Sequence, residues 1–260
     1  MLSYLTPFLL TLLAWWLCTG ILLLLNNLPA STHKWSLLGA SLLLIVSLAS
    51  LEPVAADESR PGAVLAFLQA LAIWAWLEMT YLMGVLTGVS RQPCPPESRG
   101  WNRFRLAIRT SIHHEIAVVV MGVVIIGATW DSPNNFCALA YLTLWLMRWS
   151  AKLNLFLGVA NVNEEWFPAH MKYLASYIRY RRMNPLFPFS ILLATLTAIY
   201  WIGAAGDATS AHQQTGYTLV ASLMCLAILE HAFLVLRLRD SALWNWALKA
   251  AMRYSANTVK

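Results

Sequence analysis

The sequence predicts an all-α, polytopic integral membrane protein: a bundle of about seven transmembrane helices with one further amphipathic helix on the cytoplasmic side. Three observations predict this fold. Of the 260 residues, 59% are apolar and only 12% are charged, and the mean hydropathy is +0.58, which lies outside the range of ordinary soluble domains. Seven apolar stretches have about the length that crosses a bilayer. Basic residues are concentrated in alternate loops.

The predicted spans follow one another with mostly short connections. They cover residues 5–25, 35–51, 63–88, 106–129, 136–158, 186–204 and 216–236. The second stretch is short for a span. The sixth is interrupted at its beginning by Pro185 and Pro188, since a proline removes a hydrogen bond of the helix. No internal repeat or linker divides the chain, so residues 1–260 are expected to form a single membrane-embedded helical domain.

Lysine and arginine predict how the bundle is oriented, because they are retained on the cytoplasmic side of a membrane. Alternate loops contain nearly all of them, whereas the other loops contain Arg60 among acidic residues. The amino terminus is therefore expected in the periplasm and the carboxyl terminus in the cytoplasm. The net charge of +6 is explained by this topology and by anionic lipid head groups, and it does not indicate nucleic acid.

Three cytoplasmic segments result from this topology: the loops 89–105 and 159–185 and the carboxyl-terminal tail 237–260. Prolines stiffen the first loop, which is expected to be irregular. In the second loop, residues 169–182 form an amphipathic pattern that ends in a basic cluster. This pattern predicts a helix lying on the membrane surface.

Ionisable residues lie far from the ends of three predicted spans, where a charge is expensive and usually has a role. A helix rises about 1.5 Å per residue, so these ionisable residues lie at similar depths in the cytoplasmic half of the membrane. Arg148, Lys152 and Asn154 of the fifth span lie at a comparable depth. The residues inside the three spans are Glu78; His113, His114 and Glu115; and Glu230 and His231. They are expected to form one polar layer.

Four interpretations of this layer remain open at the level of sequence. In the first, the acids pair with Arg148, Lys152 or the histidines and bind the helices together. In the second, the six residues hold a metal or a di-metal site, although adjacent residues point about 100° apart around a helix. In the third, His114 or His231 is the axial ligand of a tetrapyrrole. Proton or small-molecule transport is a fourth alternative.

The chain lacks the common local signatures of catalysis. It has no G-x-S-x-G motif, phosphate-binding loop or dinucleotide glycine fingerprint, and Val118 stands where an H-E-x-x-H motif begun at His114 needs its second histidine. Catalytic residues therefore cannot be named, and we expect a protein that is not an enzyme more than one that is.

Several motifs in order along the chain resemble a known family. They are Trp74-Ala-Trp76-Leu-Glu78, His114-Glu115, the segments 152–161 and 183–188, and Leu229-Glu230-His231. The polar residues of the most specific block are Lys152, Asn154, Asn161, Asn163, Glu164 and Glu165. Together they resemble the photosynthetic complex assembly protein 2 family, PuhE, over nearly the whole chain. Ala160 departs from a proline common in that family, and Gly88-Val89 departs from a Gly-Pro pair.

The resemblance implies a setting that composition does not show. It implies a multi-pass protein of the cytoplasmic or intracytoplasmic photosynthetic membrane of phototrophic bacteria. Its expected role is assembly or regulation of the reaction centre and light-harvesting complexes, and handling or supply of bacteriochlorophyll is one route by which it would act. Its expected partners are those complexes, other assembly factors and the lipid bilayer. The cofactor stays open between bacteriochlorophyll or a precursor and the di-metal site considered above. The alternative is an integral-membrane, metal-dependent enzyme of pigment or quinone biosynthesis.

Overall fold

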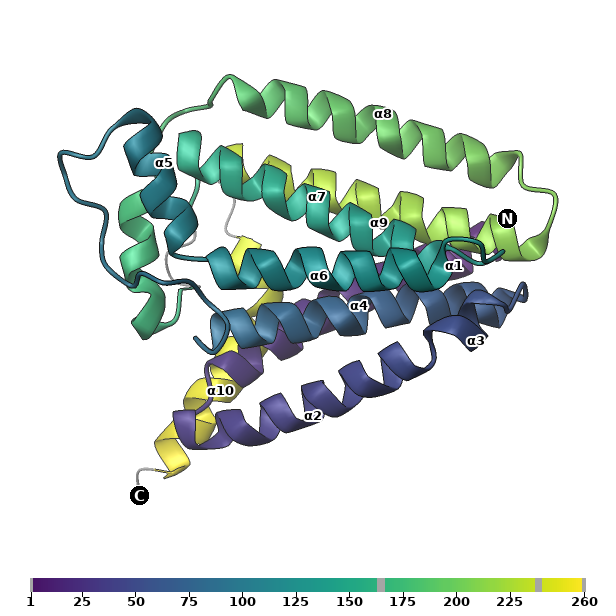
Figure 1. Cartoon of the computed structure of the whole chain (residues 1–260), viewed down its shortest axis with the longest axis horizontal. Helices are drawn as coiled ribbons and strands as arrows, with labels where there is room; N and C mark the ends of the chain where they lie inside the picture. Colours follow the sequence, from purple (N-terminus) through teal and green to yellow (C-terminus); the bar gives the residue numbers. More distant parts are fainter. Residues whose placement is uncertain (1, 163–166, 237–239, 259–260) are drawn as a thin grey trace.

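The computed structural model describes residues 2–162, 167–236 and 240–258. About 78% of it is helical and the described part contains no strand, so the predicted all-α bundle is confirmed. The long helices lie side by side, with α2 (Ala30–Ala49) at one edge and α8 (Leu186–Gly206) at the other (Figure 1). Between them, α9 (Ala211–Val235) contacts α1 (Leu2–Asn26), α4 (Arg60–Leu82), α7 (Phe136–Leu157) and α8.

Six helices of the described chain are long and apolar enough to cross a membrane: α1, α2, α4, α6 (Ile112–Thr129), α8 and α9. The remaining predicted span coincides with α7, which has 22 residues and lies in the same bundle (Figure 1). Arg148, Lys152 and Asn154 lower the hydropathy of α7. The chain is therefore a multi-pass membrane protein in which the most polar long helix lies between apolar ones.

The core of the bundle lies around α4 and α9. In their most apolar windows 56% and 50% of residues are buried, compared with 11% in α2 and α8, which therefore face outward. Phe67, Ile73 and Tyr141 are among the large buried side chains of the core. Helix α9 approaches α7 closely at Gly216, where an added Cβ atom would lie 2.0 Å from the Phe136 ring.

Several helices begin or end where a polar residue or a glycine requires it. The Ser59 hydroxyl accepts a hydrogen bond from the Gly62 amide at 3.0 Å, and the Ser210 hydroxyl accepts one from Gln213 at 3.1 Å. These serines cap α4 and α9 at their amino ends. Helix α7 ends at Gly158, whose φ of 121° is unfavourable for a residue with a side chain.

The predicted span 106–129 is wrong at its beginning. The chain forms two helices there, α5 (Gly100–Arg109) and α6, with a break at Thr110 and Ser111. The break lies in the polar stretch 109–115, in which Ile112 is the only apolar residue, so the apolar span begins later than predicted. The predicted irregular loop 89–105 consequently contains the first half of α5.

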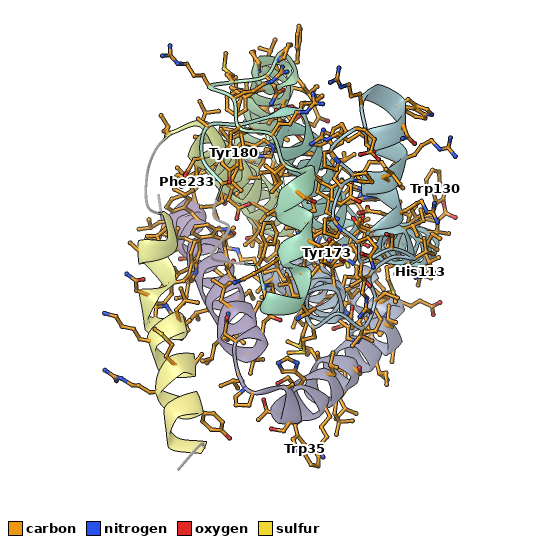
Figure 2. All side chains as sticks on the ribbon, turned by 90° about the vertical axis from the view of Figure 1, so that its left-hand side faces the viewer. Trp35, His113, Trp130, Tyr173, Tyr180 and Phe233 are labelled. Carbon is orange, nitrogen blue, oxygen red and sulfur yellow. The ribbon has the colours of Figure 1, made fainter. Side chains whose placement is uncertain are left out.

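The predicted surface helix 169–182 is also different in the structure. A 3-10 helix, η2 (Ala169–Tyr177), ends before the basic cluster, and Tyr180 pairs with Val159 in an isolated β-bridge. Met171 is completely buried, and η2 lies over the centre of the bundle when it is viewed from this end (Figure 2). Its apolar residues therefore pack on protein, because the ends of the spans supply a surface for them.

The carboxyl-terminal tail contains helix α10 (Asn245–Thr258), preceded by η3 (Asp240–Trp244). This end of the chain is held against α1 by tryptophans. The Trp16 indole donates a hydrogen bond to the Leu243 carbonyl, and the Trp244 indole donates one to the Trp16 carbonyl, both at 3.0 Å. The Trp15 and Trp244 rings meet edge to face at 5.2 Å. The tail is thus part of the packed structure.

Candidate functional site

Two ion pairs connect α7 with its neighbours in the layer formed by Glu78, His114, Glu115, Arg148 and Lys152, hereafter the polar layer. The Arg148 guanidinium lies 2.8 Å from Glu78 Oε2 of α4, and Lys152 Nζ lies 2.6 Å from Glu115 Oε1 of α6. Arg148 and Lys152 are one helical turn apart, so they extend from similar sides of α7. The two ion pairs therefore lie in one layer of the bundle, and each joins α7 to another helix.

Glu115 has further hydrogen-bond donors around its carboxylate. The Trp149 indole donates to Oε2 at 2.7 Å, and the Ser111 hydroxyl lies 3.3 Å from Oε1. Together with Lys152, these donors engage both carboxylate oxygens. A carboxylate held in this way is well suited to joining helices, because its charge is compensated inside an apolar bundle.

His114 is the unusual member of the polar layer. Only 1% of the residue is exposed, and neither ring nitrogen has a hydrogen-bond partner among the described residues. Its ring lies 4.5 Å from the Tyr81 ring, and its backbone amide donates to the Thr87 carbonyl at 3.0 Å. An unpartnered nitrogen suits a tetrapyrrole ligand chemically, but so little exposure leaves no open face for a macrocycle. The arrangement around His114 therefore does not fit a bound pigment.

His231 has neither ring nitrogen available. Nδ1 lies 2.9 Å from the Ala227 carbonyl, so this nitrogen carries the proton and donates. Nε2 lies 2.9 Å from Ser150 Oγ and accepts its hydrogen bond. His231 thus joins α9 to α7, and the structure provides no free nitrogen there for a pigment or a metal.

The six predicted metal ligands do not converge. Glu230 is exposed and accepts a hydrogen bond from the Trp15 indole at 2.6 Å, while His113 is exposed at the periphery of the bundle (Figure 2). Among the described residues, no three His, Cys, Asp or Glu side chains are close enough to share a metal ion. The physical reason is helical geometry, because adjacent residues point about 100° apart. The six candidate ligands therefore contact different groups and do not face a common centre. They are Glu78, His113, His114, Glu115, Glu230 and His231.

The asparagines of the resemblance motif connect helix ends. The Asn154 amide donates to Ser190 Oγ of α8 at 3.1 Å, and the Asn184 amide donates to Asn154 Oδ1 at 3.0 Å and to the Gly158 carbonyl at 2.9 Å. These bonds satisfy carbonyl groups that a helix end leaves free.

Asn161 makes the corresponding contact with α9. Its side-chain amide donates to the Phe233 carbonyl at 2.9 Å and to the Leu236 carbonyl at 3.2 Å. The block 152–188 therefore fastens the ends of α7, α8 and α9 together. The motif residues Asn163, Glu164 and Glu165 lie outside the described residues.

Arg103 is a structural residue that the sequence did not single out. Its guanidinium donates to the Phe156 carbonyl at 3.2 Å and to the Tyr177 carbonyl, and it lies 4.3 Å from the centre of the Phe156 ring. Burial, followed by the nearby charge of Arg179, lowers the pKa of Arg103 from its ordinary value. The alternation of charged and aromatic residues around Arg103 was the available signal, but the loop was interpreted through its prolines and its basic charge.

Comparisons with known proteins identify relatives over nearly the whole chain. The family model described as "Protein of unknown function (DUF3623)" matches residues 1–255. A Rhodobacter capsulatus protein, named "Uncharacterized 30.4 kDa protein in puhA 5'region", is 38% identical over 242 residues, which cover 92% of this chain and 88% of that protein. No solved structure gives a significant match.

Proposed function

This chain belongs to the DUF3623 family, and we propose that it is a membrane-embedded factor for assembly or regulation of the bacterial photosynthetic apparatus. One observation carries the proposal: a protein 38% identical over 92% of this chain is named for its position in the 5′ region of puhA. The resemblance of the sequence motifs to the PuhE family points to the same setting. The complexes concerned are the reaction centre and the light-harvesting complexes.

The ion pairs of the polar layer and the hydrogen bonds of His231 support a role in binding proteins over a role in catalysis. Glu78 and Glu115 are paired with Arg148 and Lys152, and His231 is hydrogen-bonded at both nitrogens. These contacts hold α4, α6, α7 and α9 in a fixed arrangement. A fixed bundle is suited to presenting the same surface to successive partners.

The outward faces of α2 and α8 provide apolar surface for such partners. Leu42 and Ile45 of α2 and Leu193 and Ile199 of α8 are all more than half exposed. In the proposed role, nascent pigment-binding helices meet the bundle within the bilayer, and the segment 159–185 faces a cytoplasmic or membrane partner. No step depends on a pigment held by His114 or His231, because neither residue offers an accessible nitrogen.

The proposed location is the bacterial cytoplasmic or intracytoplasmic membrane, with the amino terminus in the periplasm and the carboxyl terminus in the cytoplasm. The distribution of basic residues supports this orientation. The loop 83–99, α5, η2 and the tail lie at one end of the bundle (Figure 1). This end, hereafter the basic end, contains most of the lysines and arginines of the loops.

A deletion strain tests the proposal. Removing the gene from a phototrophic host should lower the absorption bands of the reaction centre and light-harvesting complexes in isolated membranes, relative to total membrane protein. Expressing the intact chain from a plasmid should restore them. Normal amounts of both complexes and of bacteriochlorophyll in the deletion strain would refute the proposal.

A further inference from the structure

Helix α5 lies across the basic end and is fixed to the bundle by its inner face (Figure 1). Arg103 is only 5% exposed, and its guanidinium caps the carbonyl of Phe156 in the last turn of α7. The Phe104 ring meets the Phe156 ring at 5.5 Å. The position of α5 is therefore set by packing, and the helix is an integral part of this end.

The outer face of α5 combines apolar and basic residues. Trp101 is 70% exposed and Ile108 is 38% exposed, and Arg105 and Arg109 are also exposed. These four residues follow the spacing i, i+4, i+7 and i+8, which places them along one stripe of a helix. A stripe of tryptophan, isoleucine and arginine is typical of helices in the head-group region of a membrane.

The charge of this face has no counterpart within the described protein. Arg99, Arg105 and Arg109 are exposed, and the ion pairs found among the described residues both lie in the polar layer. Glu97 is the acidic residue nearest to α5 in the sequence. Arginines that have no ion-pair partner among the described residues, beside exposed apolar side chains, are complementary to anionic phospholipids.

The place of α5 in the bundle agrees with a membrane interface. Viewed from the basic end, α5 lies at the outer rim, whereas η2 covers the centre (Figure 2). A helix at the rim and across the ends of the spans is at the level where head groups surround the protein. The sequence assigned this role to 169–182, but Met171 of η2 is buried, whereas the corresponding apolar residues of α5 are exposed.

We propose that α5 is an interfacial helix whose Trp101, Arg105, Ile108 and Arg109 face binds anionic phospholipid head groups of the leaflet at the basic end. This proposal depends on the membrane-spanning fold and not on the proposed function. Helix α5 leads through Thr110 and Ser111 into α6, and Ser111 contacts Glu115. Lipid bound at α5 would therefore stabilise the first turn of α6, which lies beside the polar layer.

Amide hydrogen exchange of the full chain in nanodiscs tests the proposal. We expect the peptide covering 100–109 to exchange more slowly in phosphatidylcholine mixed with phosphatidylglycerol than in phosphatidylcholine alone. Each arginine near an anionic surface contributes about a fivefold preference. The difference in exchange rate between the two lipid compositions should thus be largely lost in R105Q/R109Q. It should also decrease in about 1 M salt, where the Debye length is roughly 3 Å.

A second double variant separates this site from a general charge effect. Lys249 and Arg253 of α10 are exposed, and α10 lies at the same end of the bundle as α5 (Figure 1). The variant K249Q/R253Q therefore removes the same charge from another helix and should preserve the slowing at α5. Equal exchange in both lipids, or equal loss in the two double variants, would overturn the proposal. Protection that appears only after membrane proteins are added would also overturn it, since the surface would then belong to a protein partner.

Discussion

Replacing Arg148 by leucine should destabilise the bundle more than replacing its partner Glu78. The Glu78 side chain is 9% exposed and that of Arg148 is 36% exposed. R148L leaves a buried carboxylate without its cation, which costs about 3–5 kcal/mol. E78L leaves an arginine whose long side chain can extend toward the head groups, so its cost should be closer to that of an interhelical polar contact, about 1–2 kcal/mol.

The double variant E78L/R148L distinguishes a coupled pair from two independent sites. Replacing both charges with apolar residues removes the desolvation cost together with the attraction, and such replacements are often neutral or stabilising. The double variant should therefore unfold close to wild type. At about 2–4 °C per kcal/mol for a chain of this size class, R148L should lower the Tm by roughly 6–20 °C and E78L by roughly 2–8 °C.

Thermal unfolding in mild detergent, followed by far-ultraviolet circular dichroism, measures these values. Arg60 is exposed and forms no ion pair with the described residues, so R60L is a matched control that should change stability by no more than about 0.5 kcal/mol. A double variant as unstable as R148L, or an E78L protein less stable than R148L, would refute the reasoning.

Three further substitutions test individual contacts. His114→Phe should leave the Tm unchanged or raise it, because a buried polar group without a partner costs about 1–3 kcal/mol; a clear decrease in the same unfolding assay would indicate that the imidazole is satisfied. Gly158→Ala should destabilise by about 1–3 kcal/mol, since φ is 121° and the new Cβ would lie 2.8 Å from Arg181. Gly20→Val should loosen α10, because a Cβ there would lie 2.3 Å from the Trp246 ring, and limited proteolysis should cleave the tail faster.

Glycines in open positions provide the controls for the last two substitutions. An added Cβ at Gly127 or Gly39 meets nothing within 4 Å. Gly127→Ala should therefore preserve the Tm, and Gly39→Val should leave proteolysis of the tail unchanged. If these controls behave like Gly158→Ala and Gly20→Val, close packing is not the cause of the effects.

Hydropathy predicts the membrane fold well because lipid exposure requires long apolar helices. It fails where protein contacts decide the local structure. The chain breaks between α5 and α6 at Thr110 and Ser111, within the polar stretch 109–115 that the predicted span 106–129 included. Helix α10 was missed because its stability depends on Trp15 and Trp16, which are more than 200 positions away in the sequence.

The polar layer was predictable as a group of residues but not in its pairing. The expectation that Glu78, Glu115, Arg148 and Lys152 lie at one depth follows from helical rise, whereas the choice of partners depends on how α4, α6 and α7 are rotated. The roles of the asparagines were likewise hidden. A side-chain amide that caps a carbonyl of another helix, as Asn161 does, has no local signature in the sequence.

Pigment extracts of the deletion strain test the central claim most directly, because they separate a factor for complex assembly from an enzyme of pigment synthesis. Chromatography of these extracts should show no discrete biosynthetic intermediate, while the membrane spectrum shows reduced reaction centre and light-harvesting complexes. Accumulation of one pathway intermediate, relieved by the intact chain, would contradict the account and assign this bundle to pigment synthesis.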